Sequence, residues 1–211
     1  ALTLIEPELG QKARWLAHGM IKLPEGKMSS RSGNVITVEW LLDEAKRLIR
    51  AEYKCNDKLG EQIGQAAVKY ALLKSGIGND IVFDFKTSIS FEGNSGPYLQ
   101  YTYARCQSVL RKANLRGDSL KVGKESPDCN QQEQQVLQWL SRFDEILTEA
   151  AEELAPNIVA GYLYDLAQKF NSFYNKNRVI GNEFRLWLTS VTAQVIKQGL
   201  GILGISAPEK M

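Results

Sequence analysis

The chain has 211 residues, 44% of them hydrophobic and 24% charged, with a formal net charge of +2, as is typical of a globular protein that buries one or two cores. No apolar run approaches the roughly 20 residues that a spanning helix needs, and no basic-then-apolar leader opens the chain, so we expect a soluble, cytoplasmic protein without membrane attachment. Three widely spaced cysteines and a single histidine argue against a disulfide framework and against a zinc site.

The first part of the chain predicts a strand followed by a basic loop. Residues 13–23 are apolar enough for a strand, which we expect at the edge of a larger α/β domain. Residues 24–26 then turn the chain into a segment rich in serine, glycine and cations, residues 27–34. Glycine and asparagine permit positive φ there, so this backbone could wrap a polyphosphate. Composition alone favours an ordinary solvated connection, because no Gly-rich cradle surrounds the cations.

Two helices and an extended segment are expected next. Thr37 can cap a helix over about residues 38–56, and a second helix over about residues 60–75 should end at Gly76. From residue 81 to residue 91 apolar side chains alternate with polar ones, which predicts a linker strand. The apolar faces of the two helices are Leu41, Ala45, Leu48, Ile49 and Tyr53 in the first, and Ile63, Ala67, Tyr70 and Ala71 in the second.

From Pro97 onward the pattern is helical, and it predicts an antiparallel bundle with a short extended tail after Gly204. The expected helices cover residues 97–113, 131–154, 156–175 and 183–203.

The first bundle helix has two different faces. Leu99, Cys106 and their helical neighbours form an apolar face, whereas a second face carries Tyr98, Tyr101, Arg105, Ser108 and Lys112. Tyrosines and cations on one face suit stacking on unpaired bases with phosphate contacts alongside. The alternative is that these tyrosines fill a groove between helices with their hydroxyls in water.

A second aromatic cluster lies near the end of the helix over residues 156–175. We expect Phe170 and Phe173 to be core residues and Tyr174 to be a surface contact, because it lies beside Asn175, Lys176 and Arg178 in the sequence.

Charge is unevenly distributed along the chain. Residues 117–160 carry 3 Lys/Arg against 9 Asp/Glu, whereas residues 1–116 carry 17 against 12 and residues 161–211 carry 6 against 3. Such blocks suit either a solvated face or a protein that presents one basic face to a polyanion.

The basic loop closely resembles a known signature. Lys27-Met28-Ser29-Ser30-Arg31 is similar to the KMSKS motif of class I aminoacyl-tRNA synthetases, and the chain around it resembles the arginyl-tRNA synthetase family. Residues 18–23, 33–37, 96–105 and 194–211 carry the same resemblance, which therefore spans nearly the whole chain. The family's upstream His-x-Gly-His motif is absent, so the chain resembles the C-terminal part of a longer enzyme.

The resemblance implies a mainly α fold with three parts. Residues 1–38 would be a short α/β remnant, the C-terminal edge of the class I catalytic domain with its KMSKS-like loop. Residues 39–92 would be connecting helices and a linker strand. Residues 93–211 would be the all-helical anticodon-binding domain.

The function implied by the resemblance is attachment of L-arginine to tRNA(Arg) with ATP, and with Mg²⁺, in the longer enzyme. The chain alone should be an inactive monomer that holds neither ATP nor a metal. Lys27, Ser29, Ser30 and Arg31 would be catalytic, and Lys27, Met28 and Ser29 would contact ATP. The family's second signature lysine is replaced by Ser30 here, and Arg31 follows it, which leaves open the side chain that neutralises pyrophosphate.

The resemblance also supports RNA contacts in the helical domain, where the first bundle helix and the chain's last residues would lie together near the anticodon. The residues expected to contact RNA are Tyr98, Tyr101, Arg105, Lys112, Tyr174 and Met211. Two alternatives remain open: a standalone RNA-binding module, and the corresponding part of a related enzyme such as cysteinyl-tRNA synthetase.

Overall fold

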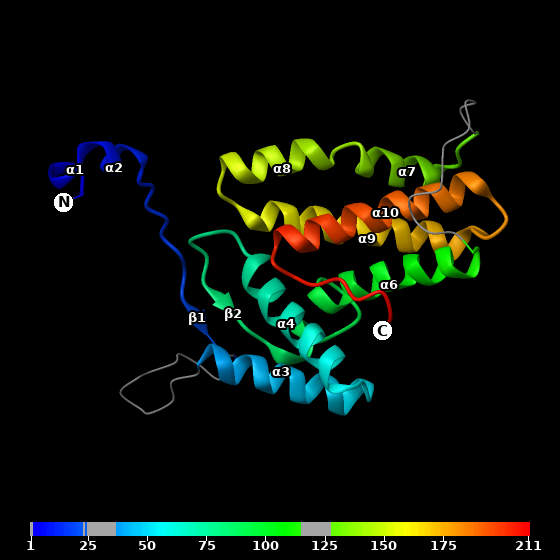
Figure 1. Cartoon of the computed structure of the whole chain (residues 1–211), viewed down its shortest axis with the longest axis horizontal. Helices are drawn as coiled ribbons and strands as arrows, with labels where there is room; N and C mark the ends of the chain where they lie inside the picture. Colours follow the sequence, from blue (N-terminus) through cyan, green and yellow to red (C-terminus); the bar gives the residue numbers. More distant parts are fainter. Residues whose placement is uncertain (1, 23, 25–36, 115–127) are drawn as a thin grey trace.

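The structure, a computed structural model, describes residues 2–22, 24, 37–114 and 128–211, and helices dominate these residues (Figure 1). The prediction of a mainly α fold is therefore confirmed. In the part of the chain that is described, no helix is both long enough and apolar enough to cross a bilayer.

The N-terminal segment projects away from the rest of the chain (Figure 1). It consists of helices α1 (Leu2–Ile5) and α2 (Pro7–Lys12), followed by residues 13–20 without regular structure and strand β1 (Ile21–Lys22). The strand predicted over residues 13–23 is thus wrong for most of its length. Among the described residues only Ile21 and Lys22 of this segment pair with another strand, and Trp15 is 87% exposed. Packing against neighbours is what stabilises a strand.

Helices α3 (Val38–Tyr53) and α4 (Asp57–Leu73) follow as an antiparallel pair. The predicted cap is confirmed, because the Thr37 hydroxyl accepts a hydrogen bond from the Trp40 amide at 3.2 Å. Asn56 caps α4 in the same way, so α4 begins earlier than expected. At Gly64 a Cβ atom would lie 2.9 Å from the backbone nitrogen of Lys46, so this glycine allows the two helices to pack closely.

The linker strand predicted over residues 81–91 is limited to β2 (Ile81–Val82), which pairs in parallel with β1. After it the Asp84 carboxylate accepts hydrogen bonds from the Thr87 amide at 2.7 Å and the Thr87 hydroxyl at 3.0 Å. These local bonds start the short helix α5 (Phe85–Ser88), because a capping aspartate competes with extended pairing. Ser88, expected on the polar side, is buried as a result.

The remaining helices form the predicted bundle. Figure 1 shows α7 and α8 running end to end along the pair formed by α9 and α10, with α6 on the side nearest α4. The bounds of these helices are α6 (Gly96–Lys112), α7 (Gln131–Leu140), α8 (Phe143–Glu152), α9 (Pro156–Lys176) and α10 (Glu183–Ile202).

The single helix predicted over residues 131–154 is two helices. At the junction the Ser141 hydroxyl donates to the Gln138 carbonyl at 3.0 Å, and the Arg142 amide donates to the Trp139 carbonyl at 3.2 Å, a tighter turn than the α-helix. Asp144 and Glu145 then lie in the first turn of α8, where carboxylates stabilise the positive end of a new helix dipole.

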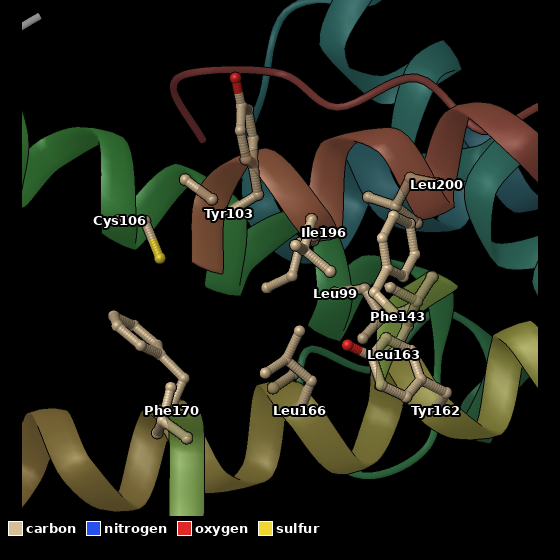
Figure 2. Close-up of a cluster of buried hydrophobic side chains, with 14 of the residues drawn as sticks. Leu99, Tyr103, Cys106, Phe143, Tyr162, Leu163, Leu166, Phe170, Ile196 and Leu200 are labelled. Atoms are coloured by element: carbon tan, nitrogen blue, oxygen red, sulfur yellow. The ribbon is translucent and has the colours of Figure 1, made fainter. Parts of the chain in front are cut away.

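The main core lies between α6, α9 and α10 (Figure 2). Phe170 and Phe173 are fully buried in it, as predicted. Helix α4 contributes Tyr70 to the same core, and a Cβ atom at Gly96 would lie 2.3 Å from the Ala66 carbonyl oxygen. This close approach packs α4 directly against α6 at the side of the bundle.

Candidate nucleic-acid interface

An open groove of about 960 Å³ lies beside α6, where the end of α9, the segment after it and the chain's last residues meet. The residues that line it are Tyr101, Ala104, Arg105, Ser108, Val109, Arg111, Lys112, Tyr174, Asn175, Asn177, Arg178, Val179, Ile180, Lys210 and Met211. Residues more than 100 positions apart in the sequence thus form one surface.

Two tyrosine rings in this groove flank one guanidinium. The Arg105 carbon Cζ lies 4.9 Å from the centroid of the Tyr101 ring and 5.2 Å from that of Tyr174. Tyr101 is 40% exposed, so its ring remains open to solvent although the arginine contacts it. Cation–π contacts of this length hold the planar groups in fixed relative positions.

The charge of the groove is positive. Arg111, Lys112, Arg178 and Lys210 all contribute to its wall, and no aspartate or glutamate is among the described residues that line it. Arg111 also donates to the carbonyl of Glu209 at 3.0 Å, which fixes one of these cations beside the chain's last residues. A hollow with cationic walls and an exposed tyrosine ring suits an unpaired, phosphate-linked ligand.

Five of the six predicted RNA-contact residues meet in the groove: Tyr101, Arg105, Lys112, Tyr174 and Met211.

Tyr98 does not line the groove. Its ring packs edge-on against Tyr164 at 5.7 Å, and its hydroxyl oxygen accepts a hydrogen bond from the Asn171 amide at 2.9 Å. Burial raises the pKa of Tyr98, and this effect exceeds the lowering by the hydrogen bond from Asn171. This placement matches the alternative in which a tyrosine fills space between helices, and direct RNA contact by Tyr98 stays a prediction.

Sequence reasoning noted Arg178 near Tyr174 but missed Arg111 and the rest of residues 177–180 as parts of the groove. Arg111 follows Ala104 and Ser108 at spacings of seven and three on α6, so helical periodicity could have identified it. The segment after α9 had no comparable signal, because its position depends on contacts with α7 and α10.

A partly buried ion pair positions that segment. The Arg185 side chain donates to the Glu133 carboxylate at 2.7 Å and to the Arg178 carbonyl at 3.0 Å. The Asn130 amide donates to the Asn177 side chain at 2.8 Å. Glu133 is only 3% exposed, so its pair with Arg185 is shielded from water. Together these bonds attach the groove wall formed by residues 177–180 to the N-terminal ends of α7 and α10.

The predicted catalytic and ATP-binding residues, Lys27, Met28, Ser29, Ser30 and Arg31, lie outside the described residues. Their roles stay predictions. Within the described ranges, no three His, Cys, Asp or Glu side chains form a group that could hold a metal ion.

Comparison with known proteins finds similarity along the whole chain. The DALR anticodon binding domain family matches residues 99–211. The arginine–tRNA ligase of Bacteroides thetaiotaomicron is 35% identical over 97% of the chain, and that of Fusobacterium nucleatum subsp. nucleatum is 38% identical over 92%. The chain spans 37% and 36% of the lengths of these two relatives.

Two solved structures are similar to this fold. The arginyl-tRNA synthetase of Thermus thermophilus matches the whole chain with a TM-score of 0.83 and 31% identity, over 38% of its own length. The enzyme of Plasmodium falciparum matches with a TM-score of 0.73 and 26% identity, over 39% of its length.

Proposed function

The chain belongs to the DALR anticodon binding domain family and matches the anticodon-binding part of arginyl-tRNA synthetases, and we propose that it binds the anticodon region of tRNA(Arg) as part of an arginine–tRNA ligase. Its partner would be the unpaired loop of the tRNA. Arginine and ATP, with Mg²⁺, would be used by the longer protein, because the chain spans only 37% of the length of the Bacteroides thetaiotaomicron ligase.

The observation that carries this proposal is the set of two tyrosines and five basic side chains in one groove. Each unpaired base exposes a flat π face, and stacking on an aromatic side chain contributes about 1 to 3 kcal/mol per base. Tyr101, whose ring is 40% exposed, would supply such a face, with the partly buried Tyr174 beside it in the groove. Lys112 and Arg178 would meet phosphate oxygens along the same wall. Sequence-specific contacts to RNA generally use splayed, single-stranded bases of this kind.

The experiment that tests the proposal is direct binding. Fluorescence anisotropy should show the chain binding a labelled stem-loop with the anticodon arm sequence of tRNA(Arg), with an affinity that falls as salt is raised. A stem of the same length closed by a loop of abasic positions is the matched control, because it keeps the phosphates and removes the bases. Equal affinity for the two would overturn the proposal, since it would leave no role for the aromatic rings.

The second candidate, a standalone RNA-binding module, is less well supported. The two ligases compared here are nearly three times as long as the matched chain, which favours a part of a larger enzyme. The cysteinyl alternative is also disfavoured, because the proteins compared are arginine–tRNA ligases by name. We further propose that the chain is a monomer, which size-exclusion chromatography with light scattering would test.

A further inference from the structure

We propose that Asn171, a side chain on α9 that does not line the groove, is a positioning residue for RNA binding. It would hold the Arg105 guanidinium between the rings of Tyr101 and Tyr174, so that both rings are ordered before a base arrives. This inference rests on the proposed function of the groove and adds a determinant behind its surface.

The hydrogen bonds around Asn171 have only one consistent direction. Arg105 can only donate, and its Nη1 lies 2.6 Å from the Asn171 oxygen. The Asn171 nitrogen must therefore point the other way, where it donates to the Tyr98 hydroxyl at 2.9 Å and to the Thr102 hydroxyl at 3.0 Å. Thr102 in turn donates its own proton to the Tyr98 carbonyl at 2.9 Å. Both amide protons of Asn171 and its oxygen are thus used.

Contacts with three residues, Asn171, Tyr101 and Tyr174, hold the guanidinium in place. Besides the bond to Asn171, the second terminal nitrogen of Arg105 lies 3.3 Å from the Tyr101 hydroxyl, and the guanidinium faces both tyrosine rings. Arg105 was expected from the sequence to contact phosphate. The contacts of its side chain give it a different task, because a guanidinium held between two rings sets their spacing. Ordering these side chains before RNA binds lowers the entropic cost of binding.

The test is a double-mutant cycle on stem-loop binding. Asn171→Leu should weaken binding of the tRNA(Arg) anticodon stem-loop about fivefold, the effect of losing roughly one hydrogen bond's net contribution. In an Arg105→Met background the same change should have no further effect, because the group it positions is gone. The slope of log affinity against log salt should be unchanged by Asn171→Leu, since no charge is lost.

Two further variants keep the result interpretable. Thr102→Val removes one acceptor of the Asn171 amide while conserving volume, and it should weaken binding less than Asn171→Leu, again with no effect in the Arg105→Met background. Gln168→Leu is the matched control, because Gln168 is an exposed amide one turn away on α9 that donates to the Tyr164 hydroxyl at 2.7 Å. It should bind the stem-loop as the unchanged chain does.

The outcomes separate the two proposals. If the unchanged chain does not bind the stem-loop, the proposed function fails. If the unchanged chain binds, and the Asn171→Leu and Thr102→Val variants bind with the same affinity as the unchanged chain, only the positioning role is overturned. Losses that persist at full size in the Arg105→Met background would also overturn it, because the effect would then come from general packing of α9 against α6.

Discussion

The side-chain nitrogen of Gln100, fully buried on α6, donates to the main-chain oxygen of Ser206 at 2.7 Å. Two other carbonyls of the same extended segment accept hydrogen bonds from Lys69 and Arg111. Three side chains of α4 and α6 therefore hold residues 204–211 against the bundle. This attachment places the last two residues in the wall of the groove, so the geometry of the groove depends in part on Lys69 and Gln100, which do not line it.

Gln100→Leu should loosen this segment without unfolding the bundle. The leucine removes the donor to Ser206 but also a buried side-chain oxygen that has no partner among the described residues, so we expect a loss of only about 1 kcal/mol in unfolding free energy. Hydrogen exchange followed by mass spectrometry should show faster exchange in residues 205–211, with the amides of α9 unchanged. Unaltered exchange in the tail would show that Lys69 and Arg111 hold it by themselves.

Glu133→Gln should destabilise the fold more than its small chemical change suggests. Glutamine can still complete the capping box with Asn130, but it removes the negative charge that faces Arg185 in a site where Glu133 is 3% exposed. We expect urea unfolding to report a loss of about 1 to 3 kcal/mol. Glu145→Gln, which breaks an exposed pair with Arg142 at 3.8 Å, should cost less than about 1 kcal/mol. Similar losses for both would mean that burial does not strengthen the Glu133 pair.

The sequence was sufficient to predict the elements whose signals are local. Thr37 as a cap and the apolar faces of α3, α4 and α6 follow from periodicity and capping chemistry, and they were confirmed. The strand over residues 13–23 failed because apolar character alone does not supply a neighbouring strand. The break in the helix over residues 131–154 was missed because its sequence carries neither glycine nor proline, and a serine such as Ser141 occurs within many continuous helices.

The candidate site was predictable where one helix face displays it. Tyr101, Arg105 and Lys112 share a face of α6, and helical spacing placed them together. The same spacing could not separate Tyr98 from them, because its rotation toward Asn171 depends on the packing of α9. Periodicity reports the direction of a residue from its own helix axis, whereas its exposure depends on the neighbour.

Alkaline pH should destabilise the fold through Tyr70. Its hydroxyl donates to the Ala160 carbonyl at 2.9 Å, and burial raises its pKa well above the ordinary value of 10.0. Below pH 10 the phenol is neutral in both the folded and the unfolded state. Above it, the unfolded chain releases a proton that the folded chain retains, so stability falls by up to about 1.4 kcal/mol per pH unit. Urea unfolding at pH 8 to 11 should show that the unfolding free energy of Tyr70→Phe falls less steeply with pH than that of the unchanged chain. If the two fall in parallel, other groups cause the effect.

In the longer arginine–tRNA ligase proposed above, Lys27→Ala should slow arginine activation far more than it weakens tRNA binding. Negative charge develops on the leaving pyrophosphate in the transition state, and a cation that meets it there lowers the barrier without strengthening binding of the ground state. Pyrophosphate exchange would measure activation, and filter binding would measure tRNA affinity. Lys210→Ala, a change in the groove wall, should show the opposite pattern. Equal losses of activation and tRNA affinity for Lys27→Ala would indicate a structural role for its loop.

Tyr101 provides the sharpest test of stacking, because its ring is 40% exposed while its hydroxyl makes only a 3.3 Å contact with Arg105. If the ring stacks on an unpaired base, Tyr101→Ala should weaken binding of the anticodon stem-loop by about 1 to 3 kcal/mol. Tyr101→Phe should weaken it far less, since the ring remains. Neither change removes a formal charge, so the salt slope should stay constant. Melting temperature is the control: a large fall for Tyr101→Ala with RNA affinity intact would make Tyr101 a packing residue between α6 and its neighbours and would contradict the stacking assignment.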